Sequence, residues 1–239
     1  MKNLNDYYIT DFIKKYFIKS KFKESILDLG CGLLPYKKFY EPKFEKIFLA
    51  DYENRHGSID IIFADAHNLP FEDSKFDVIL FSEVLEHLKN PEKSIQEISR
   101  CLKKGGELII TFPFNYQLHE APIDMYRFTE FGAKQLFDSN NLKIKKIVRR
   151  GNIISLIFTL NIFLIDYILE LLTRIKYIGF LLKYIQTLFH KLFELFFKLL
   201  FIFFKNSKGS NPNEVGNNLK GVNCIYNWHL GYCFVCEKK

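Results

Sequence analysis

The sequence predicts a doubly wound α/β fold, in which helices cover both faces of a mostly parallel sheet of about seven strands. Three observations lead to this prediction. Strand-like and helix-like segments alternate through the first 150 residues, and an apolar run at 26–29 passes into a glycine-rich turn at 30–32. A dense apolar stretch at 152–205 then precedes one more strand-like segment, which predicts a helical apolar insertion before the last strand.

Short apolar segments of buried-strand length define the predicted sheet. In the segment nearest residue 150, lysines alternate with Leu, Ile and Val, so one face of that strand should stay in water. The predicted strands are 25–29, 46–50, 60–64, 76–81, 107–112 and 142–148, with a last one at 231–235.

Two segments between these strands carry helix signals. The segment 91–102 begins at Pro91, which suits a first helical turn, and is followed by a Lys-Lys-Gly-Gly stop. The segment 129–138 begins at Thr129, a good N-cap residue. We therefore expect a core at 1–150, an apolar helical insertion at 151–205, and a linker with the last strand at 206–239.

Composition limits the partners of the chain. A formal net charge of +7 over 239 residues favours an anionic partner such as a lipid surface, a nucleic acid or a phosphorylated substrate. The first 150 residues show no basic patch interleaved with aromatics and no asparagine-proline-proline signature, so we expect no nucleic-acid partner. Residues 1–23 lack a continuous apolar run, so we expect no secretory signal peptide and a cytoplasmic location.

The five cysteines do not form a recognisable disulfide framework. Cys224, His229, Cys233 and Cys236 offer the donor types of a zinc site. However, the segment 230–237 has the pattern of a strand, in which residues three apart point to opposite faces. We therefore expect buried thiols and no metal site.

The glycine-rich turn predicts a ligand site. Positions without side chains let a ligand lie against backbone N–H groups, and Asp28 precedes the turn formed by Gly30, Cys31 and Gly32. Asp51 follows the second strand about 20 residues later, where such folds bind ribose hydroxyls. Asp65 follows the third strand at the same edge of the sheet. The alternative is that these acids only cap turns.

The order of these motifs resembles the class I S-adenosylmethionine-dependent methyltransferases, in the broad group that includes the ubiquinone-type enzymes. A dinucleotide is disfavoured because Pro35 stands where a third glycine is needed. The matching segments are ILDLGCG at 26–32, LADYE at 49–53, ADAHNLPF at 64–71, the run at 76–114 and HEAPIDMYRFT at 119–129.

The resemblance implies a Rossmann-like fold and S-adenosylmethionine as cofactor. It places Gly30, Cys31 and Gly32 beside the methionine part and Asp28 at its ammonium. The ribose would lie at Asp51 and Tyr52, the adenine at Asp65 and Ala66, and the sulfonium beside Ser82, Glu83 and Val84. His87 matches a family position that is more often structural than catalytic.

The segments at 35–38 and 119–129 resemble a narrower group of enzymes that build surface polysaccharides. This similarity implies a sugar hydroxyl as methyl acceptor. An alcohol must lose a proton, and His119 is the expected base, with Glu120 and Asp124 behind it. Arg127 would hold an anionic group of the acceptor. The alternative is that 119–127 is an ordered loop that caps the next helix.

The insertion has a wide apolar surface with a narrow polar stripe. On a helical wheel, Lys176, Lys183, Lys191 and Lys198 share one face, which suits a helix lying in a membrane interface. The segment 151–165 is the longest uncharged run and is too short to span a bilayer. The alternative is that the helices of the insertion pair with each other or with a second copy in a homodimer.

These features predict O-methylation of a glycan or lipid-linked glycan, with residues 152–205 at the inner face of the membrane. Two alternatives remain. The acceptor could be a lipid or a quinone, or the chain could bind the cofactor without catalysis and use its helices as an anchor.

Overall fold

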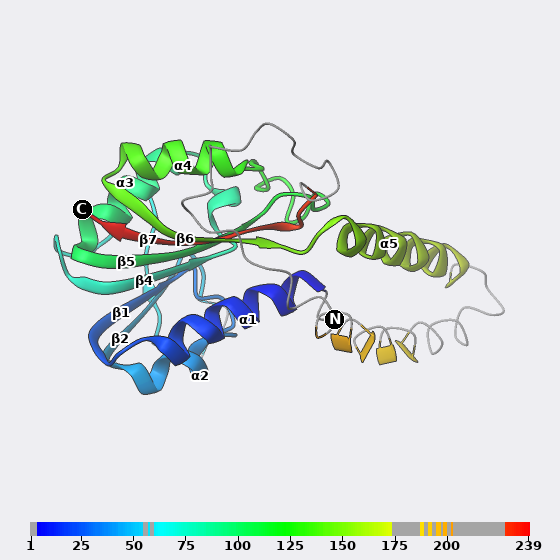
Figure 1. Ribbon diagram of the computed structural model, residues 1–239, viewed down its shortest axis with the longest axis horizontal. Helices are drawn as coiled ribbons and strands as arrows, with labels where there is room; N and C mark the ends of the chain where they lie inside the picture. Colours follow the sequence, from blue (N-terminus) through cyan, green and yellow to red (C-terminus); the bar gives the residue numbers. More distant parts are fainter. Residues whose placement is uncertain are drawn as a thin grey trace.

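The computed structural model describes residues 4–54, 57, 60–173 and 228–239, together with 187–188, 191–192, 195–196, 198–199 and 202. These residues form one seven-stranded sheet in the order β3-β2-β1-β4-β5-β7-β6. Strand β7 runs antiparallel to its neighbours β5 and β6, and the other neighbouring pairs are parallel. The predicted doubly wound α/β fold is confirmed (Figure 1).

The strands agree with the predicted apolar runs, except at one edge. The predicted third strand at 60–64 is only the two-residue β3, which pairs with β2 alone and has both side chains exposed. The strands are β1 (Lys23–Leu29), β2 (Phe44–Asp51), β3 (Ile62–Phe63), β4 (Phe76–Ser82), β5 (Leu102–Pro113), β6 (Leu142–Arg150) and β7 (Gly231–Lys238).

Both helices that were predicted between the strands are present, with their caps. Helix α3 (Pro91–Cys101) begins after Asn90, whose side chain accepts from the Lys93 N–H at 3.1 Å. Helix α4 (Glu130–Ser139) begins after Thr129, which accepts from the Gly132 N–H at the same distance. The predicted Lys-Lys-Gly-Gly stop lies inside β5, because the chain enters the sheet directly after α3.

The first helix, α1 (Leu4–Lys19), is absent from the sequence-based prediction. Its apolar residues Ile9, Phe12, Ile13 and Phe17 have helical spacing and are buried against the sheet. The short α2 (Lys37–Tyr40) and the 3-10 turn η1 (Glu41–Lys43) follow the glycine-rich turn, and a second 3-10 turn, η2 (Leu85–His87), follows β4.

Two apolar cores lie on opposite faces of the sheet. One core contains side chains of α3 and α4, and the other contains side chains of α1 and α2. Cys233 and Cys236 belong to different cores, as expected for residues three apart on β7. Cys224 lies outside the described residues.

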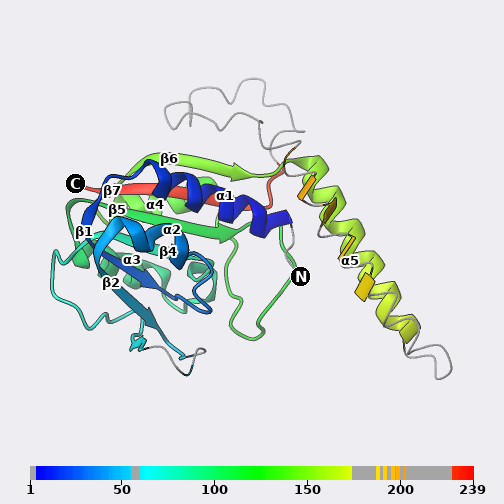
Figure 2. The same ribbon diagram turned by 90° about the horizontal axis from the view of Figure 1, so that it is seen from below.

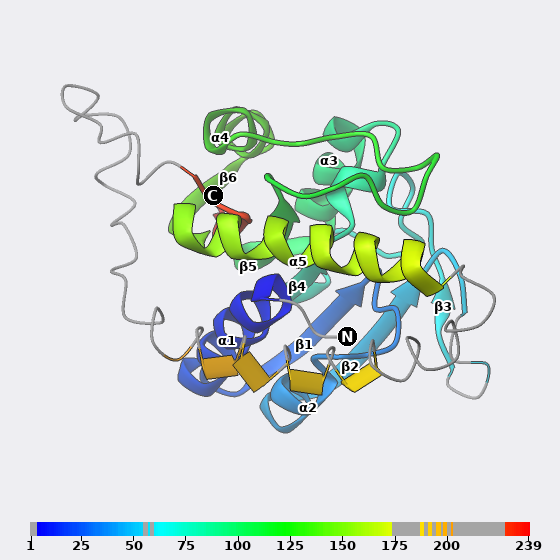
Figure 3. The same cartoon turned by 90° about the vertical axis from the view of Figure 1, so that its right-hand side faces the viewer.

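Helix α5 (Ile153–Thr173) begins directly after β6 and extends beyond the sheet (Figure 2). Its first turns pack in a small cluster with Leu4 and Leu230, and Tyr8 Oη lies 3.4 Å from Ser155 Oγ. Viewed from the end of the molecule that carries it, α5 crosses in front of the sheet (Figure 3).

The length of α5 differs from the expectation that no segment could span a bilayer. The helix continues through Asp166, and its residues Ile153–Leu172 are long and apolar enough to cross a membrane by length and composition alone.

A buried arginine joins three strand ends near α5. Arg150, the last residue of β6, is fully buried, and its Nη1 donates to Glu83 Oε1 at 2.9 Å. Its Nη2 donates to the carbonyl of Phe112 on β5. A Cβ at Gly231 would overlap this guanidinium, so glycine at the start of β7 provides its space.

We predict that Arg150→Met lowers the free energy of unfolding by about 3 kcal/mol, because it leaves the Glu83 carboxylate without its buried cation. Urea denaturation measures this loss. The control is Lys46→Met at the exposed pair with Glu24, which should cost less than about 1 kcal/mol. Adding Glu83→Gln to Arg150→Met should recover part of the loss. Equal losses for the two single variants would contradict this account.

Candidate functional site

The glycine-rich turn follows β1 and is held to the end of β2. The Gly30 N–H donates to the Ala50 carbonyl at 2.8 Å, and the Gly32 N–H donates to Asp51 Oδ2 at the same distance. Both glycines have left-handed backbone, with φ of +70° and +48°. A Cβ at Gly30 would overlap the Val84 side chain, whereas a Cβ at Gly32 would meet no atom within 4 Å. The turn therefore needs glycine and leaves space at Gly32 for a ligand.

Asp28 lies beneath this turn as a buried carboxyl group. The Tyr40 hydroxyl donates to its Oδ2 at 2.7 Å. Burial disfavours the charged form and, with the nearby Asp51 carboxylate, raises the pKa of Asp28 to about 7. A cationic group bound beside Asp28 would stabilise its ionised form, so this position suits a ligand ammonium.

The residues predicted to hold a nucleoside lie along the next two strand ends. Asp51 is half-buried and uses one oxygen to hold Gly32, while the exposed ring of Tyr52 lies 5.3 Å from that of Phe63. Asp65 is exposed and accepts from the His67 N–H at 2.8 Å, next to the buried Ala66. The two acids therefore lie at neighbouring strand ends, and each holds part of its own turn.

The end of β4 carries a connected polar network. Ser82 Oγ lies 2.8 Å from Thr111 Oγ1, and Thr111 donates to Glu83 Oε1 at 2.8 Å. The same oxygen of Glu83 accepts from Arg150. Glu83 has a φ of +54°, so the chain turns sharply there and directs Val84 against Gly30. Cys31 is buried between the two turns.

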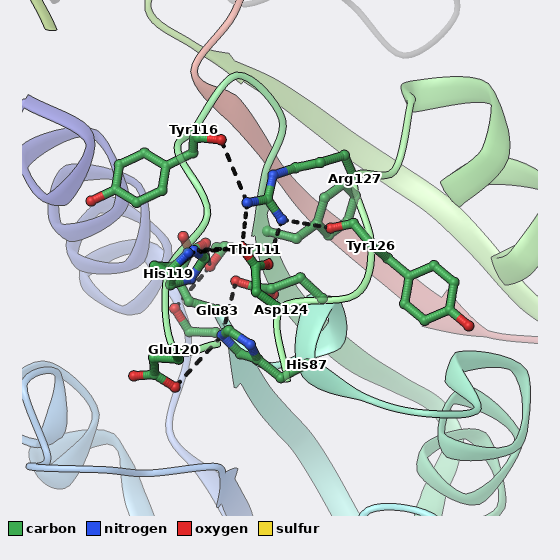
Figure 4. A network of polar contacts seen from close by, with 12 residues as sticks. Glu83, His87, Thr111, Tyr116, His119, Glu120, Asp124, Tyr126 and Arg127 are labelled. Atoms are coloured by element: carbon green, nitrogen blue, oxygen red, sulfur yellow. Dashed lines mark hydrogen bonds and ion pairs between the residues drawn. The ribbon is translucent and has the colours of Figure 1, made fainter. Parts of the chain in front are cut away.

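The loop after β5 brings together His119, Asp124 and Arg127 (Figure 4). The Asp124 side chain is 1 % exposed and accepts from both terminal nitrogens of Arg127, at 2.5 and 2.6 Å. The His119 N–H donates to Asp124 at 3.0 Å, and His119 Nδ1 lies 3.1 Å from Asp124 Oδ2. Arg127, and then His119, hold the pKa of Asp124 well below its usual range.

The contacts of Arg127 bear on the catalytic roles predicted for Asp124 and Arg127. Besides Asp124, the Arg127 guanidinium binds the carbonyls of Tyr116, Gln117 and Tyr126, so it is occupied by internal acceptors. These contacts favour the alternative interpretation, in which Asp124 and Arg127 position an ordered loop. Of the three predicted catalytic residues, His119 keeps a partly exposed ring that a substrate can reach.

Glu86 was missed by the sequence analysis, and His87 was given only a structural role. Glu86 is fully buried, and neither carboxylate oxygen has a hydrogen-bond partner among the described residues. Burial, and then the charge of Glu83, raises the pKa of Glu86 well above its usual value. His87 Nε2 lies 3.7 Å from Glu86 Oε1, and the His87 and His119 ring centroids are 4.9 Å apart. The sequence signal that could have identified this cluster is the group of Glu83, Glu86 and His87, which follow one another within five residues after a strand.

Residues 27–110 match the family model described as a methyltransferase domain. A demethylmenaquinone methyltransferase of Paenarthrobacter aurescens is 32% identical over 98 residues, which cover 38% of this chain and 39% of the relative. A sterol 4-C-methyltransferase of Caenorhabditis elegans is 44% identical over 99 residues, which cover 35% of this chain and 29% of the relative. The chain therefore matches less than half the length of these curated relatives.

Solved structures show the same fold. A SAM-dependent methyltransferase from Archaeoglobus fulgidus superposes with a TM-score of 0.56 at 15% identity, covering 96% of this chain and 93% of that one. Phosphoethanolamine N-methyltransferase 2 of Haemonchus contortus, solved in complex with S-adenosyl-L-methionine, superposes with a TM-score of 0.53 at 18% identity. The superposition covers 96% of this chain and 52% of that one. Together with the strand order, these superpositions show the fold of the class I S-adenosylmethionine-dependent methyltransferases, and residues 27–110 match a methyltransferase domain.

Proposed function

We propose that this chain transfers a methyl group from S-adenosylmethionine to a sugar hydroxyl of a glycan or lipid-linked glycan at the cytoplasmic face of a membrane. The observation that supports it most is the junction of the two turns at the carboxyl edge of the sheet. There, Gly30 lies against Val84, Gly32 faces open space, and the nearby Asp28 is buried. Open parallel sheets bind ligands at this edge.

The residues at this edge fit the cofactor. Asp28 is a buried carboxyl group whose ionised form needs a cation, and the ammonium of the cofactor would supply one. The backbone of 30–32 would hold the methionine part, with Asp51 and Tyr52 at the ribose and Asp65 and Ala66 at the adenine. Ser82, Glu83 and Val84 would flank the sulfonium. The bound cofactor supplies the reactive methyl group, and the protein contributes mainly positioning.

The proposed acceptor site lies between the loop at 115–128 and the end of β4. Asp124 holds the backbone and ring of His119 in place, so His119 can accept the proton of an acceptor hydroxyl. The similarity of 119–129 to enzymes that build polysaccharides supports a sugar as acceptor. The buried Asp124–Arg127 pair would then stabilise the ordered conformation of the loop at 115–128.

Helix α5 supports a location at a membrane. It begins where β6 ends, at the edge that carries the site, and the Phe163 ring lies 6.0 Å from that of Tyr116 in the acceptor loop. Ile157, Leu160, Leu164 and Leu171 form an exposed apolar stripe along the helix. On another side of α5, the Phe158 ring lies 5.7 Å from that of Phe196, a contact that is compatible with the alternative of paired helices.

A lipid or quinone acceptor is the second candidate. The exposed apolar stripe of α5 lies close to the acceptor loop, and some relatives carry the names of quinone and sterol methyltransferases. In this case the same cofactor site would act on a carbon or oxygen of an apolar ring. Most of the lysine stripe predicted over 176–205 lies outside the described residues, although Lys191 and Lys198 are exposed.

We predict that Gly30→Ala weakens cofactor binding at least about 10-fold, because the new methyl group must displace Val84 from the turn. Calorimetric titration measures the affinity. The matched control is Gly105→Ala, since Gly105 has a similar φ of +75° but open space around it. It should lose only about 1–2 kcal/mol of stability and no affinity. Full binding by Gly30→Ala would contradict the placement of the cofactor.

The second prediction concerns the acceptor. With a cofactor labelled in its methyl group, the label should appear on a sugar hydroxyl of a lipid-linked saccharide and not on quinones of a lipid extract. His119→Ala should keep its cofactor affinity and lose about 10²- to 10⁴-fold in turnover. Mass spectrometry of the products gives both results. A labelled quinone would replace the sugar proposal with the second candidate, and unchanged turnover would remove His119 from the mechanism.

The third prediction concerns the membrane. The protein should sediment with anionic vesicles, and the double variant Leu160→Glu, Leu164→Glu should reduce the bound fraction several-fold, because both side chains are 56% exposed on α5. The matched control changes Ile18 and Phe22 to glutamate, which removes equally exposed apolar side chains from α1 and its loop. Equal losses in the two variants would contradict membrane contact through α5.

A further inference from the structure

Three side chains of metal-binding type converge beside the proposed acceptor site. One potential ligand atom from each of Glu86, His87 and His119 lies within 4.8 Å of the other two. Atoms that bind one ion at about 2.0–2.2 Å are about 3–4 Å apart, so a side-chain shift of about 1 Å would bring them to bonding distance. We propose that Glu86, His87 and His119 bind a divalent transition-metal ion. This proposal departs from the expectation, stated from the sequence, that the chain has no metal site.

The buried Glu86 is the observation that points to a ligand. Its side chain is fully buried, and neither oxygen has a hydrogen-bond partner among the described residues. The same holds for His87 Nδ1. A buried ionised carboxylate without a partner costs several kcal/mol, on the order of the desolvation of one charge. A bound cation would offset this cost, and the two neighbouring imidazoles would complete its coordination.

The backbone holds the two halves of the cluster together. The Glu86 carbonyl accepts from the Met125 N–H at 2.9 Å and from the Tyr126 N–H at 3.1 Å. The turn after β4, which carries Glu86 and His87, is therefore fixed to the loop that carries His119. A metal site requires this kind of support, because ligands from separate loops must keep their mutual distance.

His119 is oriented like a metal ligand. Its Nδ1 lies 3.1 Å from Asp124 Oδ2 and 3.3 Å from the Gln117 carbonyl, which leaves Nε2 for the ion. Metal-binding histidines usually donate their other ring N–H to a carboxylate or carbonyl, which fixes the tautomer. The Asp124–Arg127 pair would then be the support of a ligand. This explains why a buried ion pair lies in an otherwise exposed loop.

The ligand set identifies the class of ion. Two imidazoles with one carboxylate suit Zn²⁺, Mn²⁺, Co²⁺ or Fe²⁺ better than Mg²⁺ or Ca²⁺, which prefer oxygen ligands. Three protein ligands leave coordination positions open, as in catalytic sites. The carboxylate of Glu120 lies 3.9 Å from His87 Nε2, at the rim of the cluster.

The location suggests a use for the ion, and this step rests on the proposed function. Glu86 and His87 follow Val84, which contacts the glycine-rich turn, so an open coordination position would lie on the acceptor side of the cofactor. A hydroxyl bound there would have a lowered pKa and a fixed position. His119 would then hold the ion, and the proton of the bound hydroxyl would pass to solvent, which would replace the base role given to His119 above.

The test measures metal binding without acceptor. Protein freed of its affinity tag and treated with a chelator is titrated with Mn²⁺ and Zn²⁺ by calorimetry and with Co²⁺ by visible absorption. We expect one ion per chain. Glu86→Gln and His119→Ala should each weaken binding at least about 100-fold, because loss of a direct ligand should cost no less than loss of its supporting partner. His67→Ala, which removes a histidine outside the cluster, should bind the ion as the unchanged protein does.

Two controls keep the outcome clear. Glu86→Gln preserves the shape of the side chain, and unchanged affinity for S-adenosylmethionine would show that the variant is folded. Binding that persists in both Glu86→Gln and His119→Ala would place the ion elsewhere, for instance at cysteines, and would overturn the proposal. So would the absence of binding in the unchanged protein. Metal binding without methyl transfer would instead contradict only the proposed function.

Discussion

The contact between Arg150 and Glu83 is the interaction on which the rest of the site depends. Arg150 is fully buried, and its guanidinium reaches the first residue after β4 and a carbonyl of β5. Because a buried charge must be paired, this contact fixes the ends of three strands at one position. It also holds Glu83 in left-handed backbone, which a residue with a side chain adopts only when its surroundings enforce it. The chain continues from that turn through Val84, Glu86 and His87. Their positions therefore depend on Arg150, which is more than sixty residues away in the sequence.

Two buried carboxyl groups, those of Asp28 and Glu86, lie at the same edge of the sheet, and burial disfavours the charged form of both. Burial raises the pKa of Asp28 to about 7, and burial is also the main reason that the pKa of Glu86 lies well above its usual value. Both lie next to turns that meet at Val84. In an apolar interior such groups favour protons or bound cations, and perturbed carboxyl groups in one region indicate a functional site. The ammonium of a cofactor at Asp28 and a metal ion at Glu86 would each relieve one of these costs.

The sequence was sufficient for the parts of the fold that local pattern determines. Strands β1, β2, β4, β5, β6 and β7 appear as apolar runs, and Pro91 and Thr129 mark the starts of the two helices that were predicted between strands. It was insufficient where partners are distant. Strand β3 is shorter than its apolar pattern predicted and has both side chains exposed, and α1 was missed because its Lys and Asp residues mask the spacing of its apolar side chains. No local sequence pattern shows that the Arg127 guanidinium donates its hydrogen bonds to Asp124 and to three backbone carbonyls.

The position of α5 connects the fold to the nature of the acceptor. Strand β6 runs parallel to β5, because both are antiparallel to β7, so its last residue lies at the carboxyl edge and α5 begins there. The helix contacts the acceptor loop through Phe163 and Tyr116 and exposes an apolar stripe over its remaining length. A surface that buries this stripe would therefore meet the molecule beside the methyl donor. An acceptor held in a lipid surface, as proposed above, would need to diffuse in only two dimensions to reach the site.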